Sequence, residues 1–198
     1  MILKHETTTL MTKKALAASL KKLMEKKPLG KISVREIIED CGVNRKTFYY
    51  HFHDIYELVK WMFEEEAIEV VKQYDLMIDF QDAIYFAVNY VEENKHICSC
   101  AFDALGRDEL KRFFYKDFYS VIGNIVDQLS EGMAVPEDYR MFLTSFYTEA
   151  LASLLIDWIQ NKEIPGKENR SKETLVQYIS LILSGMKQDL ERGEKELK

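Results

Sequence analysis

The stretch 33–58, SVREIIEDCGVNRKTFYYHFHDIYEL, constrains the fold more than any other part of the sequence. Ser33 begins an S-x-x-E sequence, the spacing of a capping box, which predicts that a helix starts at this point. Gly42 can adopt the left-handed backbone conformation at which many helices end. Asn44 and Asp54 are favourable N-caps for two further helices. The stretch therefore predicts two short helices joined by a tight turn, followed by the start of a third.

The second of these helices is short, polar and basic at its amino-terminal turn. A helix of this kind, placed after a helix and a glycine-containing turn, is the helix-turn-helix arrangement that enters the major groove of DNA. Arg45 can make a bidentate contact to guanine, which discriminates against other bases by roughly 1–3 kcal/mol. The alternative is that Tyr49 and Tyr50 pack inside the fold and that Arg45 is a solvated cation. The residues expected to contact DNA are Ser33, Asn44, Arg45, Lys46, Thr47, Tyr49, Tyr50 and His51.

These residues closely resemble the TetR family of bacterial transcriptional regulators. The matching positions are Ser33, Ile37, Ile38, Cys41–Asn44, Thr47–Phe52 and Leu58. Lys46 stands where many members have a small residue, and Ile55 stands where a lysine that contacts phosphate is common. The resemblance implies that Tyr49 and His51 contact the DNA backbone. Within the family, the sequence looks similar to regulators of dihydroxyacetone kinase operons, some of which respond to a partner protein and can activate.

The net charge is divided unevenly along the chain. Residues 1–60 contain 12 Lys and Arg against 7 Asp and Glu, a net charge of +5, whereas residues 61–198 carry a net charge of −11. Basic side chains that neutralise phosphates supply most of the non-specific affinity for DNA. We therefore predict an N-terminal DNA-binding domain over residues 1–58, and a larger helical domain for dimerisation and effector binding over residues 59–198.

Helical periodicity continues through the rest of the chain. An amphipathic helix is expected from Thr12 to the breaker Pro28, after a frayed arm over residues 1–11. From Asp54 a helix without a breaker is expected to cross the junction between the two domains and to act as a lever. No strand-type alternation of any length appears in the sequence. The expected fold class is all-α, with about nine helices if the chain follows the TetR arrangement.

Two late segments, FYTEALASLLIDWIQ and TLVQYISLILSGMKQDL, are apolar over more than one narrow stripe. A helix with a single partner has no need of such a wide apolar surface. We expect these segments to pair with those of a second copy, so that a homodimer presents two recognition helices to a near-palindromic operator. The residues expected in this interface are Ser153, Leu154, Trp158, Tyr178, Leu181 and Gly185.

The body is rich in aromatic residues, most of which are expected to be core. Tyrosine hydroxyls and an asparagine within such a cluster are polar groups of the kind that a mostly apolar ligand pocket uses. The family resemblance implies an effector pocket in this body, and the sequence leaves open whether the effector is a small molecule or a protein. The residues expected to line the pocket are Trp61, Tyr85, Asn89, Phe102, Phe114 and Tyr147.

Other classes of function find little support in the sequence. It contains no G-x-S-x-G, P-loop, H-E-x-x-H or glycine-rich dinucleotide turn, so we expect neither an enzyme nor a cofactor. His96, Cys98 and Cys100 could form a soft-metal cluster, but cysteines in apolar segments are usually small buried hydrophobes, and no metal site is expected. No segment is apolar enough to cross a membrane and no secretory signal is present, which predicts a soluble, cytoplasmic protein without membrane partners.

The sequence thus predicts a sequence-specific transcriptional regulator, expected to be a repressor, whose partner is double-stranded operator DNA. An effector that binds the C-terminal domain would release it or switch it. The alternative is a helical protein-interaction module whose partner is another protein, a co-regulator, rather than a small ligand. A steep salt dependence of binding to promoter DNA would separate the two.

Overall fold

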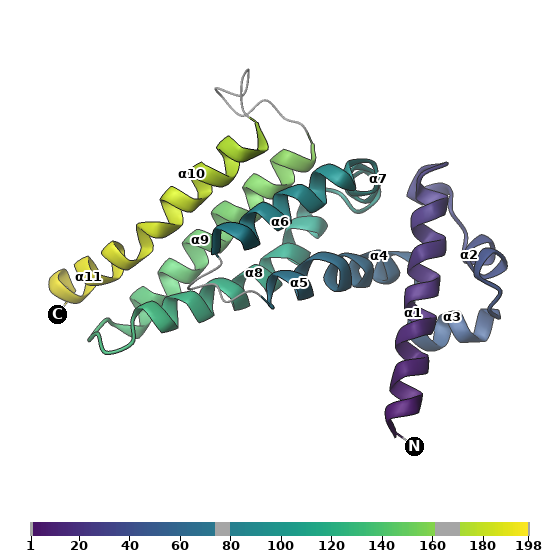
Figure 1. Cartoon of the computed structure of the whole chain (residues 1–198), viewed down its shortest axis with the longest axis horizontal. Coiled ribbons are helices and arrows are strands. Elements are labelled where there is room, and N and C mark those ends of the chain that lie inside the picture. The colour runs from purple at the N-terminus through teal and green to yellow at the C-terminus, as the bar shows by residue number, and fades with distance from the viewer. Residues whose placement is uncertain (1, 74–79, 161–170, 198) are drawn as a thin grey trace.

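The computed structural model describes residues 2–73, 80–160 and 171–197, and all regular structure within these ranges is helical (Figure 1). The helices are α1 (Ile2–Met24), α2 (Val34–Cys41), α3 (Arg45–His51), α4 (Ile55–Phe63), α5 (Glu69–Val71), α6 (Phe80–Glu93), α7 (Lys95–Leu105), α8 (Arg107–Leu129), α9 (Glu137–Ile159), α10 (Lys172–Ser184) and α11 (Met186–Glu196), with a 3-10 turn at Leu29–Lys31. A π-helical turn, Glu64–Ile68, joins α4 to α5, and α11 continues α10. Counted as continuous rods, the described residues form nine helices, which confirms the predicted all-α fold.

The three short-range signals in the stretch 33–58 form the caps that the sequence predicts. The Ser33 hydroxyl accepts a hydrogen bond from the Glu36 N–H at 3.4 Å, and the Glu36 carboxylate accepts one from the Ser33 N–H at 3.0 Å. Gly42 ends α2 with φ at +71°, the left-handed region that glycine enters without a steric penalty. The Asn44 side chain accepts from the Thr47 N–H at 2.8 Å and begins α3. These caps fix the orientation of α3 relative to α2.

One compact apolar core holds α1 to α4 together. Its fully buried members include Leu16, Leu20, Met24, Ile37, Phe48 and Leu58. The Ser19 hydroxyl is also buried and donates to the Ile37 carbonyl at 3.0 Å, which ties α1 to α2 by a specific bond. We call residues 2–58, with this core, the amino-terminal module.

The amino-terminal half of α1 corrects one expectation. A frayed arm was expected over residues 1–11, but the structure has a helix from Ile2, so that prediction is wrong for the described residues. Adding a residue to an existing helix is far easier than nucleating one, and no glycine or proline interrupts the chain before the docked half of α1. Figure 1 shows this half extending beyond α3.

The helix that begins at Asp54 leads from the amino-terminal module into the rest of the molecule (Figure 1). The Lys14 ammonium lies 3.0 Å from the Glu65 carboxylate, and the Lys21 ammonium lies 2.7 Å from that of Glu66, so both ion pairs join α1 to the π-helical turn. The apolar core of the module also continues into α7, α8 and α9. A domain boundary at residue 58 stays a prediction, because packing continues across it.

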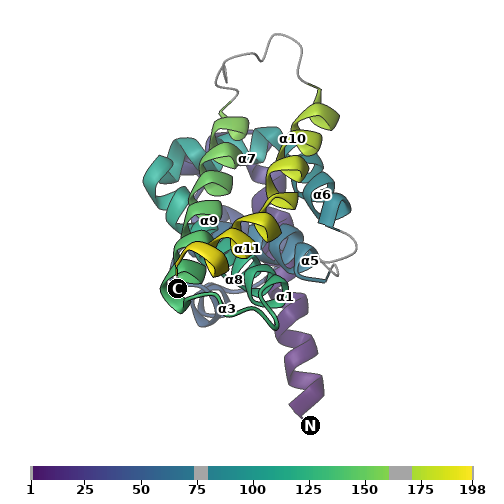
Figure 2. The same ribbon diagram turned by 90° about the vertical axis from the view of Figure 1, so that its left-hand side faces the viewer.

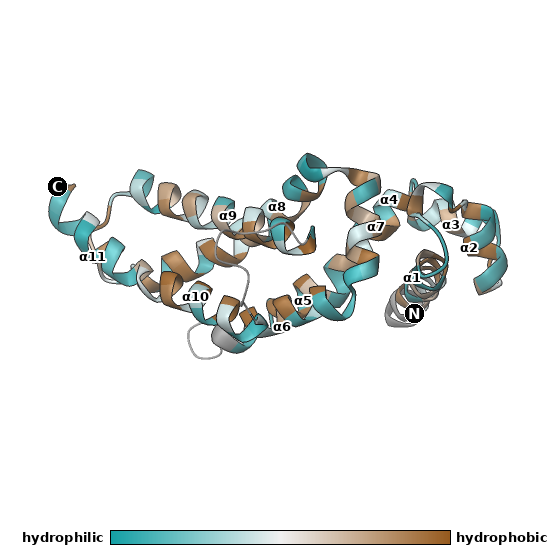
Figure 3. Ribbon diagram, turned by 90° about the horizontal axis from the view of Figure 1, so that it is seen from above, coloured by the Kyte–Doolittle hydropathy of each residue, from teal (hydrophilic) through white to brown (hydrophobic). Residues whose placement is uncertain are grey.

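The remaining helices, α6 to α11, form the body. Figure 2 shows the body end-on, down its long axis. In Figure 3, which is seen from above, α8 and α9 lie along one side of the body and α6 and α10 lie along the other. A second apolar cluster, separate from that of the module, includes Ile122, Leu143, Leu183 and Leu190. None of the helices in the described ranges is long and apolar enough to cross a membrane.

Candidate nucleic-acid interface and body cavity

Helix α3 presents one face to the core and the other to solvent. Phe48 is fully buried and anchors the inner face. Arg45 and Lys46 are exposed on the first turn, and Tyr49 and Tyr50 expose 47% and 70% of their surface. The alternative that both tyrosines pack inside the fold is therefore wrong for this chain.

The side chain of Arg45 is held against Tyr49 one turn further along α3. Its Nη2 donates a hydrogen bond to the Tyr49 hydroxyl at 3.4 Å, and its guanidinium carbon lies 5.5 Å from the centre of the tyrosine ring. A guanidinium stacked in this way loses less freedom when it forms further hydrogen bonds. The pair thus forms a partly ordered cationic feature on the outer face of α3.

Several cations on α1, on α2 and in the turn between them already have acidic partners. Lys14, Lys21, Lys22, Lys27 and Arg35 each pair with a carboxylate of the same chain. Among the residues that the structure describes, neither Arg45 nor Lys46 has such a partner. Lys26 and Lys31 are likewise exposed without a carboxylate partner among the described residues, but neither lies on a helix of the helix-turn-helix pair. The first turn of α3 therefore keeps two adjacent cations available to an external anion.

Three of the predicted contact residues take part in the caps. The Ser33 hydroxyl donates to the Glu36 carboxylate at 2.8 Å, and the Thr47 hydroxyl donates to the Asn44 side-chain oxygen at 3.1 Å. The Lys27 ammonium, together with the N–H and hydroxyl of Ser33, lowers the pKa of Glu36 to about 2. These side chains position α3 in the free chain, and their contacts with DNA stay a prediction.

A cation–π contact that the sequence analysis missed supports the end of α3. The Lys13 ammonium lies 5.4 Å from the ring centre of Phe52 and 5.5 Å from that of Trp61. The two rings lie 5.8 Å apart. Trp61, which was expected in the effector pocket, therefore packs at the base of the amino-terminal module.

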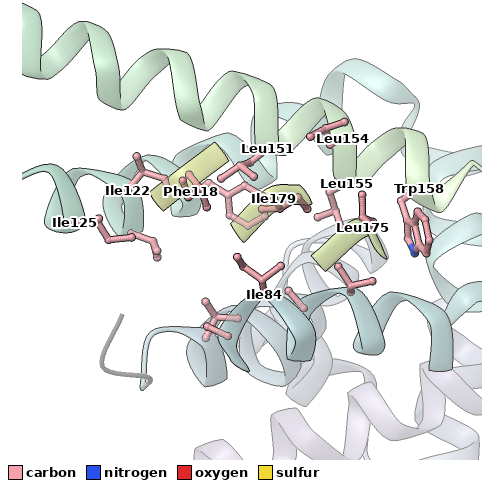
Figure 4. A pocket seen from close by; sticks show the side chains of 16 residues that line it. Ile84, Phe118, Ile122, Ile125, Leu151, Leu154, Leu155, Trp158, Leu175 and Ile179 are labelled. Atoms are coloured by element: carbon pink, nitrogen blue, oxygen red, sulfur yellow. The ribbon is translucent and has the colours of Figure 1, made fainter. Parts of the chain in front are cut away.

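The body contains a cavity of about 110 Å³ that is partly open to solvent (Figure 4). It lies among helices α5, α6, α8, α9 and α10, and the described residues that line it all have apolar side chains apart from the indole N–H of Trp158. The lining residues are Val71, Ala83, Ile84, Ala87, Val88, Phe118, Val121, Ile122, Ile125, Leu151, Leu154, Leu155, Trp158, Leu175, Ile179 and Leu183.

None of the six residues expected in an effector pocket lines this cavity. Tyr85 is exposed, and the Lys172 ammonium lies 4.6 Å from its ring centre while donating to the Asn89 side-chain oxygen at 2.6 Å. Tyr147 donates to the Asp189 carboxylate at 2.8 Å, and this bond together with burial raises the pKa of Tyr147. Phe102 and Phe114 belong to the apolar core that continues from the module. The structure does not gather the six around one space.

The outer faces of α9 and α10 expose large apolar side chains, which we call the α9–α10 face. Its members are Met141, Phe142, Phe146, Tyr178, Leu181 and Ile182. Tyr178 and Leu181 belong to the predicted interface, whereas Ser153 and Gly185 are half-buried. Leu154 and Trp158, also predicted for the interface, contribute to the cavity wall instead. A helix with apolar residues all round does not reveal from sequence which side faces inward.

The cysteine-rich segment lies in the core. Cys98 and Cys100 are buried, and burial raises the pKa of the Cys98 thiol to about 12. The His96 ring nitrogen lies 3.0 Å from the Met24 carbonyl oxygen, which links α7 to the end of α1. Within the described ranges, no three His, Cys, Asp or Glu side chains come together as metal ligands would.

Comparisons with known proteins agree with this geometry. The sequence model of bacterial regulatory proteins of the tetR family matches residues 16–62, and that of a transcriptional regulator C-terminal region matches residues 79–185. The HTH-type dhaKLM operon transcriptional activator DhaS of Lactococcus lactis subsp. lactis (strain IL1403) is 29% identical over 87 residues, which cover 44% of this chain. The match spans 46% of that relative, less than half of its length.

Two solved structures share the fold. The dihydroxyacetone kinase operon activator DhaS superposes with a TM-score of 0.68 at 22% identity, over 90% of this chain and 98% of that one. A TetR transcriptional regulator from Streptococcus agalactiae 2603V superposes with a TM-score of 0.54 at 19% identity, over 92% of this chain and 99% of that one. At these identities the likeness establishes the arrangement of the helices.

Proposed function

The chain belongs to the TetR family of bacterial transcriptional regulators, and on this premise we propose that it binds a near-palindromic operator as a homodimer and represses transcription. Members of the family are regulators and not enzymes. Helix α3 reads the major groove, and the body carries the dimer contact and the effector site.

The observation that carries this proposal is the unneutralised charge on the first turn of α3. Arg45 and Lys46 are exposed and, within the described part of the chain, have no carboxylate partner, whereas five other cations of the module have one. Base contacts of a recognition helix are made mainly from its amino-terminal residues. Arg45 is the side chain that we assign to guanine, and Tyr49 and His51 are assigned to phosphates.

The α9–α10 face supports the homodimer. An apolar surface of several large side chains is rarely left open on a monomer, and a two-fold axis would place the same face of a second copy against it. Two recognition helices then lie roughly 34–36 Å apart, or a multiple of this, which matches successive major grooves. A co-regulator protein that covers this face in place of a second copy would instead favour the interaction module.

The sign of regulation has a second candidate. The Lactococcus lactis relative, 29% identical over 87 residues, is named as an activator, which makes activation the second candidate. A promoter–reporter fusion with and without the protein separates the two, because a repressor lowers basal expression and an activator raises it. The DNA-binding proposal holds in both cases.

The test compares two charge-removing variants by fluorescence anisotropy, on DNA from the region that flanks the gene and on random DNA of equal length. Arg45→Ala should reduce the preference for specific DNA by roughly 10–100-fold, which corresponds to about 1–3 kcal/mol. Arg192→Ala is the matched control, because Arg192 is an exposed cation on α11, far from α3 (Figure 1). Tyr49→Phe should weaken binding to both DNAs about equally. If Arg45→Ala leaves the preference intact, the assigned base-reading role is wrong.

A further inference from the structure

The body cavity has a lining of unusual chemical uniformity. The lining comes from five helices and consists of Val, Ala, Ile, Leu and Phe side chains with a single Trp (Figure 4). The indole nitrogen of Trp158 is the only polar side-chain atom that these residues carry, and it can donate a hydrogen bond but cannot accept one. None of the described lining residues bears a charge.

Such a lining selects strongly among ligands. A hydroxyl or charged group that enters it leaves its water partners and finds no acceptor in the lining side chains. A hydrocarbon group, in contrast, supplies the dispersion contacts that the walls of an empty space lack. Apolar side chains offer water no hydrogen-bond partner, so an apolar ligand that enters displaces only weakly held water. The chemistry therefore favours an uncharged ligand without hydrogen-bond donors.

The volume of the cavity limits the size of the ligand that it can bind. Its volume of about 110 Å³ is somewhat smaller than an engineered apolar cavity of about 150 Å³ that binds benzene. We propose that this cavity is a binding site for an uncharged apolar molecule of about the size of benzene, and that it excludes polyols and charged metabolites. The proposal rests on the effector-dependent function proposed above and names the chemical class of the effector.

The cavity also borders α5, the end of the helix that begins at Asp54 and connects the amino-terminal module to the body. Val71, the last residue of α5, lines it, and the neighbouring Lys72 pairs with the Asp117 carboxylate at 3.1 Å. Asp117 precedes Phe118, which lines the cavity from α8. A ligand that displaces Val71 or Phe118 would therefore alter the ion pair between α5 and α8, and with it the helix that leads back to the amino-terminal module.

The test is a titration of the full chain with fluorobenzene, followed by ¹⁹F NMR, in the absence of DNA. We expect saturable binding from which toluene displaces the probe. Phenol, which has nearly the same shape but carries a hydroxyl donor, should compete at least tenfold more weakly than toluene, and glycerol should not compete. No saturable binding by wild type, or equal competition by phenol and toluene, would overturn the proposal.

Variants that fill the cavity test whether fluorobenzene binds there. Ala87→Leu fills the cavity from α6 and should abolish fluorobenzene binding, whereas Ala18→Leu makes the same change on an exposed position of α1 and should leave it unchanged. If Ala87→Leu does not fold, Leu151→Phe fills the same space from α9. Full binding by a folded, filled variant would overturn the assignment. A wild type that binds fluorobenzene but shows no specific DNA binding would count against the proposed function and not against the cavity.

Discussion

The amino-terminal module and the body differ in how completely one chain buries their apolar side chains and pairs their buried polar groups. In the module, the large core residues are fully buried and the two short helices begin at side-chain caps. In the body, the described residues line a partly open apolar cavity, and the buried hydroxyls of Thr148 and Ser180 have no hydrogen-bond partner among them. The body also exposes the α9–α10 face.

This difference indicates where each part obtains its stability and its function. The module is complete within one chain, so its geometry can be held constant while it reads DNA. A void and an exposed apolar face each leave favourable contacts unmade, and a ligand or a second subunit can supply them. We therefore expect a binding partner to change the conformation of the body, and the module to respond through its contacts with DNA.

The largest effect should follow from removing the anchor of the module. Phe48→Ala deletes a fully buried ring and should lower the free energy of unfolding by about 3–5 kcal/mol, measured by urea denaturation. Tyr50→Ala, on the exposed side of the same helix, should change it by less than about 0.5 kcal/mol. Equal losses for both variants would mean that α3 is not held by its inner face.

A charged residue placed in the α9–α10 face should have the next largest effect. We expect this effect on the assembly of two chains and not on folding. Leu181 exposes 63% of its surface in one chain, so a glutamate there is tolerated until a second apolar surface covers it. Leu181→Glu should weaken the proposed dimer by about 100-fold, near 2.7 kcal/mol, in sedimentation equilibrium. Gln128→Glu adds the same charge on an exposed position of α8 and should leave the dimer intact.

An alanine-to-leucine substitution should have different effects on the stability of the chain when it is made in the module and when it is made in the body. Ala17 lies within the packed core of the module, and Ala17→Leu should destabilise the chain by about 1–3 kcal/mol through overpacking. Ala87 borders the cavity, and Ala87→Leu should leave stability unchanged or increase it. Thermal unfolding measures both variants, and a destabilised Ala87→Leu would show that the cavity walls cannot accept additional side-chain atoms.

The helix caps of the amino-terminal module were predictable from the sequence. Ser33, Asn44 and Asp54 each hydrogen-bond a backbone N–H only three residues away, so the sequence alone defines the partners. The exposure of Arg45 on the first turn of α3 follows from the same local signals. For this reason the first residue of each of these helices was predictable from its near neighbours, whereas the side of α3 that faces outward was left open between two alternatives.

Long-range packing was not predictable in this way. The ion pair between Lys21 and Glu66 joins residues 45 positions apart, and no pattern near either one indicates the other. Leu154 and Trp158 lie on a helix that is apolar on several sides, and their place in the cavity wall depends on the path of α6 and α10. The lining of the cavity is thus a property of the assembled body.

The ion pair at the junction offers a smaller but more informative change. Glu66 accepts hydrogen bonds from Lys21 at 2.7 Å and from the Tyr90 hydroxyl at 2.8 Å, and so connects the module to α6. Glu66→Gln should lower the free energy of unfolding by about 0.2–1 kcal/mol, since both partners of the ion pair are about a third exposed. A double-mutant cycle with Lys21→Met measures the coupling, and a coupling of zero would show that this contact does not link the two regions.

The smallest effect concerns the cap of α2 and its dependence on pH. Because the folded chain lowers the pKa of Glu36 to about 2, its ionised cap stabilises the fold above the ordinary glutamate pKa of about 4.5. This stabilisation is lost as the pH falls from about 4.5 towards 2. The difference in unfolding free energy between wild type and Glu36→Gln, measured by urea denaturation, should therefore shrink as the pH falls from 6 to 3. Lys27 is the main cause of the lowered pKa, so the same comparison in a Lys27→Met background should depend much less on pH. An unchanged pH dependence in that background would assign the effect to the Ser33 cap alone, and the stability of the module would then depend on one local motif without support from the end of α1.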